Sequence, residues 1–361
     1  MKRPKRGLCG RKAVPASSTV YNPRLMAMSR NSRRFLGLLL GILISAVALY
    51  LVLRWAGWEP LLAALKRMDA RFLLLAVVVY LASMLARTAA WKTMMNNKYG
   101  FGRVLAALNE GYLLNNVLPW RLGEVGRAVL LGRHPGGSIL SVLSSILVER
   151  LFDLAIALGL LFALLPHVAG LPNVPRTGLS IAVVLFIIIA VLWLLVRKPE
   201  WIESVVSRPP GGEKRWMPAW ERVRQGLQAL QDPRLFFTSL GWMLLTWTLA
   251  GVEYWLIMRA FIPEAEWTWA FFMLTITLLG GAIPSVPGYF GVFEAAGVLA
   301  LSVFGVPTAE ALAISLTIHG MVYSLGSLFG FIALLNEGET ISGLYHDIRK
   351  WLSTGSNQQA D

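Results

Sequence analysis

Three charged residues lie close together in the middle of a long apolar run, residues 139–165. They are Glu149, Arg150 and Asp153. A charge at the centre of a membrane-spanning helix costs about 2.5 to 3.5 kcal/mol, so three charges facing lipid would nearly cancel the tendency of the helix to insert. Glu149 and Asp153 share a helix face beside Arg150, so an ion pair is available. We expect all three to face the protein interior, either as a polar clamp between helices or as the lining of a site for a charged headgroup or a proton relay.

A second set of charges recurs every three residues, at Arg121, Glu124 and Arg127. This spacing places them along one side of a helix that begins after Pro119. Backbone N–H groups and the macrodipole at a helix N-terminus favour an anion, and two guanidinium groups there would bind a lipid phosphate. Glu124 would hold the two arginines in place. Alternatively, Arg121 and Arg127 only extend to the cytoplasmic headgroups.

Two apolar segments, residues 104–132 and 267–304, are interrupted by proline and glycine. Proline removes a backbone donor and glycine relaxes the chain, so we expect each segment to form two half-helices joined by non-helical backbone. Such backbone survives at membrane depth only where protein buries it or where it lines a wet cavity. Both breaks are therefore candidates for a polar pathway. The residues that mark them are Pro119, Gly123, Pro284, Pro287, Gly288 and Gly291.

The two interrupted segments share a weak pattern, in which a proline stands four residues before a glycine and a glutamate follows. With the amino end of the chain in the cytoplasm, the first segment dips in from the cytoplasmic side and the second from the outside. The pattern therefore predicts two broken or re-entrant helical hairpins related as an inverted repeat, an arrangement that places transporter sites at the repeat interface.

Glu294, the glutamate of the second segment, has no basic residue nearby in the sequence. We expect a partner from another segment, either Arg87 or Arg150. Arg87, Glu253 and His319 stand alone in other apolar runs, and we expect each to be structural or interfacial.

The composition identifies an integral membrane protein. Of the 361 residues, 56% are hydrophobic and 15% are charged, and the mean hydropathy is +0.58, which leaves too little polar surface for a soluble chain. A spanning helix needs about 20 mainly apolar residues. We predict an all-α, polytopic helical bundle with the two hairpins and about six full spans, at residues 35–53, 72–91, 139–165, 179–196, 235–258 and 309–335.

Basic residues set the predicted orientation in the cytoplasmic membrane. Ten of them fall within residues 1–34 with no acid among them, which indicates a cytoplasmic and disordered amino terminus; Met1, Met26 and Met28 are alternative starts. Residues 35–340 form the membrane domain and residues 341–361 a short cytoplasmic tail. The loop 197–234 has eight basic and five acidic residues, so we place it inside, with residues 220–227 as an amphipathic surface helix or a plain connector.

Little in the sequence suggests metal, cofactor or nucleic-acid binding. Cys9 is the only cysteine, the four histidines lack metal-ligand spacing, and no phosphate-binding glycine signature is present. The net charge of +14 reflects the basic amino terminus. We therefore expect no catalytic residue, no metal, no cofactor and no nucleic-acid partner.

Residues 115–127, 148–153 and 283–294, in this order, resemble the lysylphosphatidylglycerol synthase transmembrane-region family, whose members are also called flippase-like domain proteins. The resemblance spans nearly all of residues 35–340. In two-part members it implies a membrane module that moves aminoacylated phosphatidylglycerol between leaflets, joined to a soluble synthase domain. Only about 26 residues follow Leu335, too few for such a domain, so we expect a stand-alone member without synthase activity. The site positions that the resemblance implies are Arg121, Glu124, Arg127, Glu149, Arg150, Asp153, Pro287, Gly288, Gly291 and Glu294.

The favoured hypothesis is a non-enzymatic lipid flippase for an anionic phospholipid or a lipid-linked glycan. Arg121 and Arg127 would receive the headgroup, the charges of residues 149–153 would line the middle, and Glu294 would line the outer half. One alternative is a membrane scaffold for a separate lipid-modifying or glycosyl-transferring enzyme. An intramembrane transferase with Glu149 or Glu294 as general base lacks a visible nucleophile. The sequence leaves the lipid, the direction, the energy coupling and the oligomeric state open, a homodimer among the alternatives.

Overall fold

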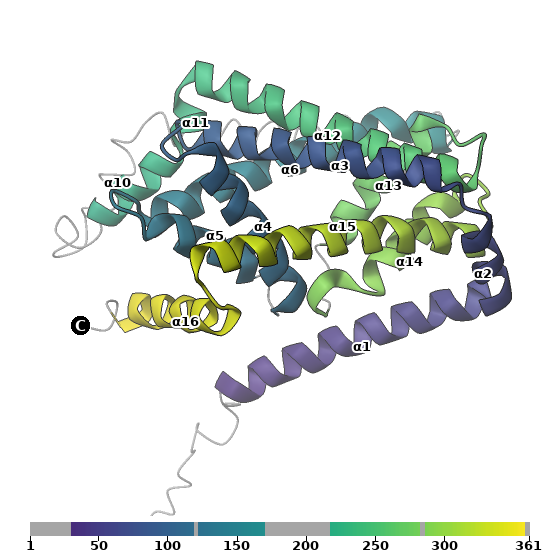
Figure 1. Cartoon of the computed structure of the whole chain (residues 1–361), viewed down its shortest axis with the longest axis horizontal. Coiled ribbons are helices and arrows are strands. Elements are labelled where there is room, and N and C mark those ends of the chain that lie inside the picture. Colours follow the sequence, from purple (N-terminus) through teal and green to yellow (C-terminus); the bar gives the residue numbers. More distant parts are fainter. Residues whose placement is uncertain (1–29, 119–121, 170–216, 282–285, 358–361) are drawn as a thin grey trace, which may run out of the picture. The chain divides into compact units, whose positions relative to one another are not determined.

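The computed structural model describes residues 30–118, 122–169, 217–281 and 286–357, and the regular elements within these ranges are all helices (Figure 1). The chain divides into two units, Met1–Gly37 and Leu38–Asp361. Of the first unit, only the beginning of helix α1 (Arg30–Ala56) is described, and every contact given below lies within the second. The prediction of an all-α fold is confirmed for the described residues. Residues 1–29, most of the terminus predicted to be disordered, lie outside them.

Three of the helices that the structure describes are long and apolar enough to cross a membrane: α3 (Ala70–Met94), α12 (Pro233–Phe261) and α15 (Thr308–Glu337). Residues 42–56 of α1 and helix α2 (Trp58–Arg67) are together long and apolar enough to cross as well, but the chain bends by 80° between them. Gly57 at this bend has a φ of 74°, a conformation that glycine adopts without steric cost. These helices correspond to four of the six predicted runs.

The predicted count of about six full spans is not confirmed. Helix α6 (Ile139–Ala169) covers the run 139–165 and has 31 residues, which at 1.5 Å per residue gives a length of about 46 Å. It falls short of a clear apolar span because Glu149, Arg150 and Asp153 lie in its middle. The run 179–196 lies outside the described residues.

The first interrupted segment is a pair of antiparallel helices, α4 (Phe101–Val117) and α5 (Leu122–Gly132), as the sequence predicted. The two backbones meet at glycines: a Cβ on Gly123 would lie 2.0 Å from the carbonyl oxygen of Gly111. The N–H of Gly123 donates to Asn115 Oδ1 at 2.9 Å. This bond supplies a partner for one of the N–H groups that the first turn of a helix leaves unpaired. Pro119 and Arg121 lie outside the described residues.

The second interrupted segment is also divided, into α13 (Trp267–Gly280) and α14 (Val292–Ser302), with the short 3-10 helix η3 (Pro287–Tyr289) between them. Gly288 and Gly291 have φ values of 77° and 84°, which explains the need for glycine at both positions. A Cβ on Gly291 would in addition lie 2.3 Å from the carbonyl oxygen of Ser45 in α1. Pro284 lies outside the described residues, and the inverted-repeat relation of the two hairpins stays a prediction.

Long helices hold the two hairpins in place (Figure 1). Helix α3 packs along α12, α4 packs along α15, and α13 contacts both α12 and α6. The stretch 220–227 falls largely in helix α10 (Met217–Gly226), which packs against α6, and α11 (Gln228–Gln231) leads from it to α12. Helix α16 (Ile341–Asn357) packs on α5. Because α6 contacts both α5 and α13, its charged middle lies between the two hairpins.

Candidate functional site

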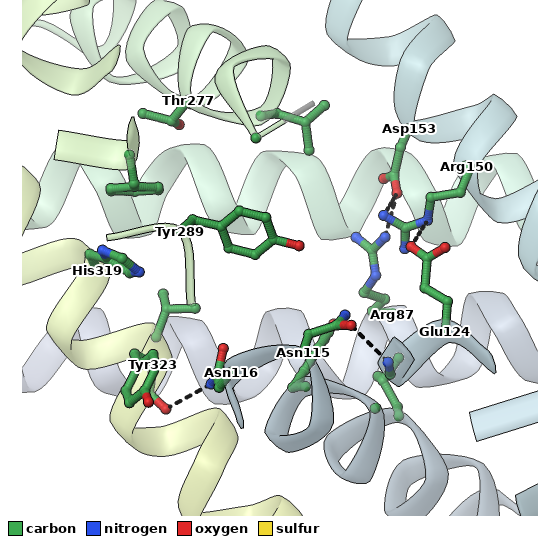
Figure 2. A pocket seen from close by; sticks show the side chains of 18 of the residues that line it. Arg87, Asn115, Asn116, Glu124, Arg150, Asp153, Thr277, Tyr289, His319 and Tyr323 are labelled. Carbon is green, nitrogen blue, oxygen red and sulfur yellow. Dashed lines mark hydrogen bonds and ion pairs between the residues drawn. The ribbon is translucent and has the colours of Figure 1, made fainter. Parts of the chain in front are cut away.

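Both hairpins border one cavity of about 470 Å³ (Figure 2). The first contributes Asn115, Gly123 and Glu124, and the second contributes Tyr289 and Phe293; α3, α6 and α15 complete the wall. A volume of this size falls within the range of about 300 to 1,000 Å³ that is typical of small-molecule sites. The two backbone breaks predicted to border a polar pathway therefore flank the same cavity.

Six charged residues lie together at one end of the cavity, and all of them except Glu149 line it. We refer to them as the ion network: Arg87, Glu124, Arg127, Glu149, Arg150 and Asp153. Glu149 is its centre and is fully buried. Its carboxylate lies 2.8 Å from the guanidinium of Arg87, 2.8 Å from that of Arg127 and 3.0 Å from that of Arg150. Three helices, α3, α5 and α6, are joined through this one carboxylate.

Asp153 forms a second junction of the ion network. Its carboxylate lies 2.5 Å from Arg87 and 3.1 Å from Arg150, and it accepts a hydrogen bond of 3.0 Å from the indole N–H of Trp247 in α12. Arg127 lies over the ring of Trp91 at 4.5 Å, a cation–π distance. The network contains three cations and three anions, so it can stay ionised away from water, where a single uncompensated charge would be costly.

Exposure is graded across the ion network. Glu149, Arg127 and Asp153 are almost fully buried, whereas the side chains of Arg150 and Glu124 are 35% and 31% exposed. Figure 2 shows Arg87, Arg150 and Glu124 at the cavity surface, and the contact of 3.6 Å between Glu124 and Arg150 is the longest in the network. The guanidinium of Arg150 therefore faces the cavity, and its outermost carboxylate partner, Glu124, is held weakly.

Trp247 provides a modest test of the geometry at Asp153. We expect Trp247→Phe to lower the free energy of unfolding by about 1 kcal/mol, because Asp153 loses one donor while its two arginines remain. Chemical unfolding in detergent micelles measures the change. A variant as stable as the wild type would contradict a contribution of this hydrogen bond to the fold.

A second buried polar pair lies at the other hairpin. Glu294, fully buried in the first turn of α14, accepts the backbone N–H of Gly291 at 2.6 Å and lies 2.6 Å from Nδ1 of His319 in α15. The imidazole ring lies between Phe290 and Phe293, with ring centroids 4.7 and 4.6 Å away. His319 lines the same cavity as the ion network. The pair thus connects the turn of the second hairpin to a long helix.

Glu294 does pair with a residue from another segment, as predicted, but the two expected partners were wrong. Neither Arg87 nor Arg150 reaches it, because both are taken by Glu149 and Asp153, and the partner is His319. The separation of 25 residues between the two gives no local spacing from which the pair could be inferred.

The predicted site residues that the structure describes gather around the cavity. Glu124, Arg127, Arg150, Asp153 and Gly123 line it directly. Buried partners connect Glu149 and Glu294 to it, and η3 and the turn before α14 contain Pro287, Gly288 and Gly291. Their roles stay predictions.

Sequence reasoning missed several lining residues. Arg87, expected to be structural or interfacial, joins α3 to the ion network and lines the cavity. Among the described residues, the end away from the network is uncharged apart from His319, and it combines apolar side chains with the polar Asn116, Tyr289 and Tyr323 (Figure 2). The amide of Asn116 donates to Ser327 Oγ at 2.9 Å. The pair of asparagines just before Pro119 was a signal that could have been used.

The described side chains suit binding of a charged group better than metal chemistry. Within the described ranges, no three His, Cys, Asp or Glu side chains are arranged to hold a metal ion. The acids of the ion network are paired with arginines, and Glu294 is paired with His319. The arrangement offers guanidinium, phenol and amide donors to an anionic or hydroxylated ligand.

Comparison with known proteins places the chain in a family. Residues 38–330 match the model of the lysylphosphatidylglycerol synthase TM region. A UPF0104 membrane protein of Methanothermobacter thermautotrophicus is 27% identical over 79% of this chain and 90% of its own length. UPF0104 membrane protein MJ1595 of Methanocaldococcus jannaschii is 21% identical over 81% of this chain and 93% of its own length. No solved structure matches.

The two relatives have a tenth or less of their length outside the match, which is too little for a separate enzyme domain. They are thus similar to this chain over the membrane region itself. Because the family model matches most of the sequence, the resemblance found in the three motifs is confirmed. The chain is an integral membrane protein that belongs to the lysylphosphatidylglycerol synthase TM-region family.

Proposed function

We propose that this protein moves the headgroup of an anionic phospholipid or lipid-linked glycan between membrane leaflets. The observation that carries the proposal is the ion network, whose guanidinium groups face a cavity of headgroup size between two broken hairpins. Charges inside a membrane bundle are costly, and where they occur they commonly mark a substrate pathway. A purely structural clamp needs no cavity beside it.

The geometry suggests how a phosphate would enter. Glu124 holds Arg150 through the longest contact of the ion network, and both side chains are about a third exposed. A phosphate could replace Glu124 as a partner of Arg150 while the buried carboxylates keep the remaining charge compensated. The polar headgroup would occupy the cavity, and the acyl or prenyl chains would stay in hydrocarbon. This process forms and breaks no covalent bond, so the proposal is a transporter and not an enzyme.

Lipid exposure in reconstituted vesicles tests this function. We expect the wild type to raise exchange of a fluorescent phosphatidylglycerol between leaflets above the protein-free rate, and Arg150→Ala to reduce this gain by about tenfold or more, because an anion loses a charge-assisted partner. Arg133→Ala is the control: Arg133 pairs with Glu339 and Asp347 and is not among the cavity residues. Exchange at the protein-free rate with folded wild-type protein would refute the proposal.

The same experiment separates the flippase from the scaffold alternative. A scaffold would leave leaflet exchange unchanged and would retain a lipid-modifying or glycosyl-transferring enzyme in a pull-down. We also propose that both termini face the cytoplasm, since the basic residues concentrate at the amino end and in the loop 197–234. Labelling of Cys9 in right-side-out and inverted vesicles tests the position of the amino terminus.

A further inference from the structure

His319 is a titratable residue placed where it can sense an anion in the cavity. Its ring lines the cavity, its Nδ1 lies 2.6 Å from the buried carboxylate of Glu294, and the side chain is almost completely enclosed. When Nδ1–H donates to Glu294, Nε2 has the lone pair that takes up a proton. Histidine is the side chain whose charge ordinarily changes between about pH 5 and pH 8.

Protonation of His319 would make the cavity wall more positive. The ion network contributes three positive and three negative charges, and Glu294 contributes one more negative charge. Uptake of one proton by His319 adds one positive charge to the cavity wall, whatever the total. An anion is therefore bound more tightly when His319 is protonated, and by linkage the bound anion promotes proton uptake to the same extent.

The phenols and the paired acids around His319 are poorly suited to titrate in this range. The phenols that share the cavity belong to Tyr80 of α3, Tyr112 of α4, Tyr289 of η3 and Tyr323 of α15, and phenols ordinarily ionise near pH 10. The acids of the ion network are held by guanidinium groups. Glu294 of α14 is the direct partner of His319, and α12, which also packs against α15, contains the buried Glu253.

We propose that His319 and Glu294 form a proton-binding site that couples proton uptake to entry of an anionic headgroup into the cavity. This inference rests on the proposed function, to which it adds the coupling ion. One proton taken up with a singly charged phosphodiester brings no net charge into the bundle, which reduces the cost of carrying the headgroup through an apolar environment. While the proton is bound, the carboxylate of Glu294 stabilises the imidazolium of His319.

Isothermal titration of detergent-solubilised protein with short-chain phosphatidylglycerol tests the coupling without any transport. The phosphodiester stays ionised over the range studied, so protons exchanged with buffer report on the protein. Comparing buffers of different ionisation enthalpy gives the number of protons taken up for each lipid bound. We expect uptake approaching one proton in the wild type and affinity about a hundredfold weaker at about pH 8.5 than at about pH 5.5.

Three variants identify the residue. His319→Gln retains a donor to Glu294 and should bind lipid with no proton uptake and a flat pH profile. Glu294→Gln should shift the wild-type pH profile to lower pH, because the imidazolium loses its partner. His346→Gln, at an exposed position of α16, should behave as the wild type. Circular dichroism and thermal unfolding establish that each variant is folded.

The outcomes separate this inference from the transport function. Wild-type binding without proton uptake, binding that is absent at every pH, or an unchanged pH profile in His319→Gln would each overturn the proton site. Leaflet exchange that proceeds with a pH-independent rate would overturn it as well while leaving the flippase intact. Proton-linked binding without leaflet exchange would support the site and refute transport.

Discussion

We expect Glu149→Ala to lower the free energy of unfolding by about 3 to 5 kcal/mol and to abolish lipid transport. Glu149 is fully buried and joins Arg87, Arg127 and Arg150 within 3.0 Å. Removing it leaves buried guanidinium groups with too few counter-charges, which is the costly way to break a buried ion pair. Chemical unfolding in detergent, followed by tryptophan fluorescence, measures the change.

Glu339→Ala is the matched control for this prediction. Its carboxylate pairs with Arg133 at 3.3 Å, and both side chains are about one third exposed. Exposed ion pairs contribute about 0 to 1 kcal/mol, so this variant should be nearly as stable as the wild type. If Glu149→Ala and Glu339→Ala were equally stable, the ion network would not hold the three helices together.

Gly123→Ala should be the second most damaging change. A methyl group at this position would lie 2.0 Å from the carbonyl oxygen of Gly111 and 2.6 Å from Asn115 Oδ1. The nearest atom belongs to backbone, so the strain is relieved only if α4 and α5 separate, which would also displace Glu124 and Arg127. We expect a loss of about 3 kcal/mol or more in the free energy of unfolding and strongly reduced lipid transport.

Gly102→Ala on α4 is its control. No atom lies within 4 Å of a Cβ there, and alanine in a helix is favoured over glycine by up to about 1 kcal/mol. This variant should be as stable as the wild type or slightly more stable. Wild-type stability and transport in Gly123→Ala would show that the close approach of the two hairpin helices is not required.

Local rules predicted the hairpins well, because their signals are contained within short stretches. Proline followed closely by glycine favours the end of a helix, so the breaks near Gly123 and Gly291 could be predicted from the sequence. The cost of burying charge likewise predicted that Glu149 and Asp153 face the interior. These arguments need no knowledge of which helices are neighbours.

Pairings between distant segments could not be predicted in the same way. Arg87 reaches Glu149 across 62 residues, and Glu294 reaches His319 through packing of α14 on α15. Several charged residues were possible partners, and a single sequence contains no information on which of them lie close together in the fold. The number of spans was also difficult to predict, because an apolar run such as 139–165 can be long enough and yet be interrupted by buried charges.

For the proposed transport, an anionic headgroup has to occupy the cavity beside the ion network. An experimental structure of the protein in nanodiscs containing phosphatidylglycerol tests it most directly. We predict phosphate density within about 4 Å of the guanidinium groups of Arg87 and Arg150, where an ion pair would place it. A well-resolved cavity without lipid, with phosphate confined to the outer surface of the bundle, would contradict the account.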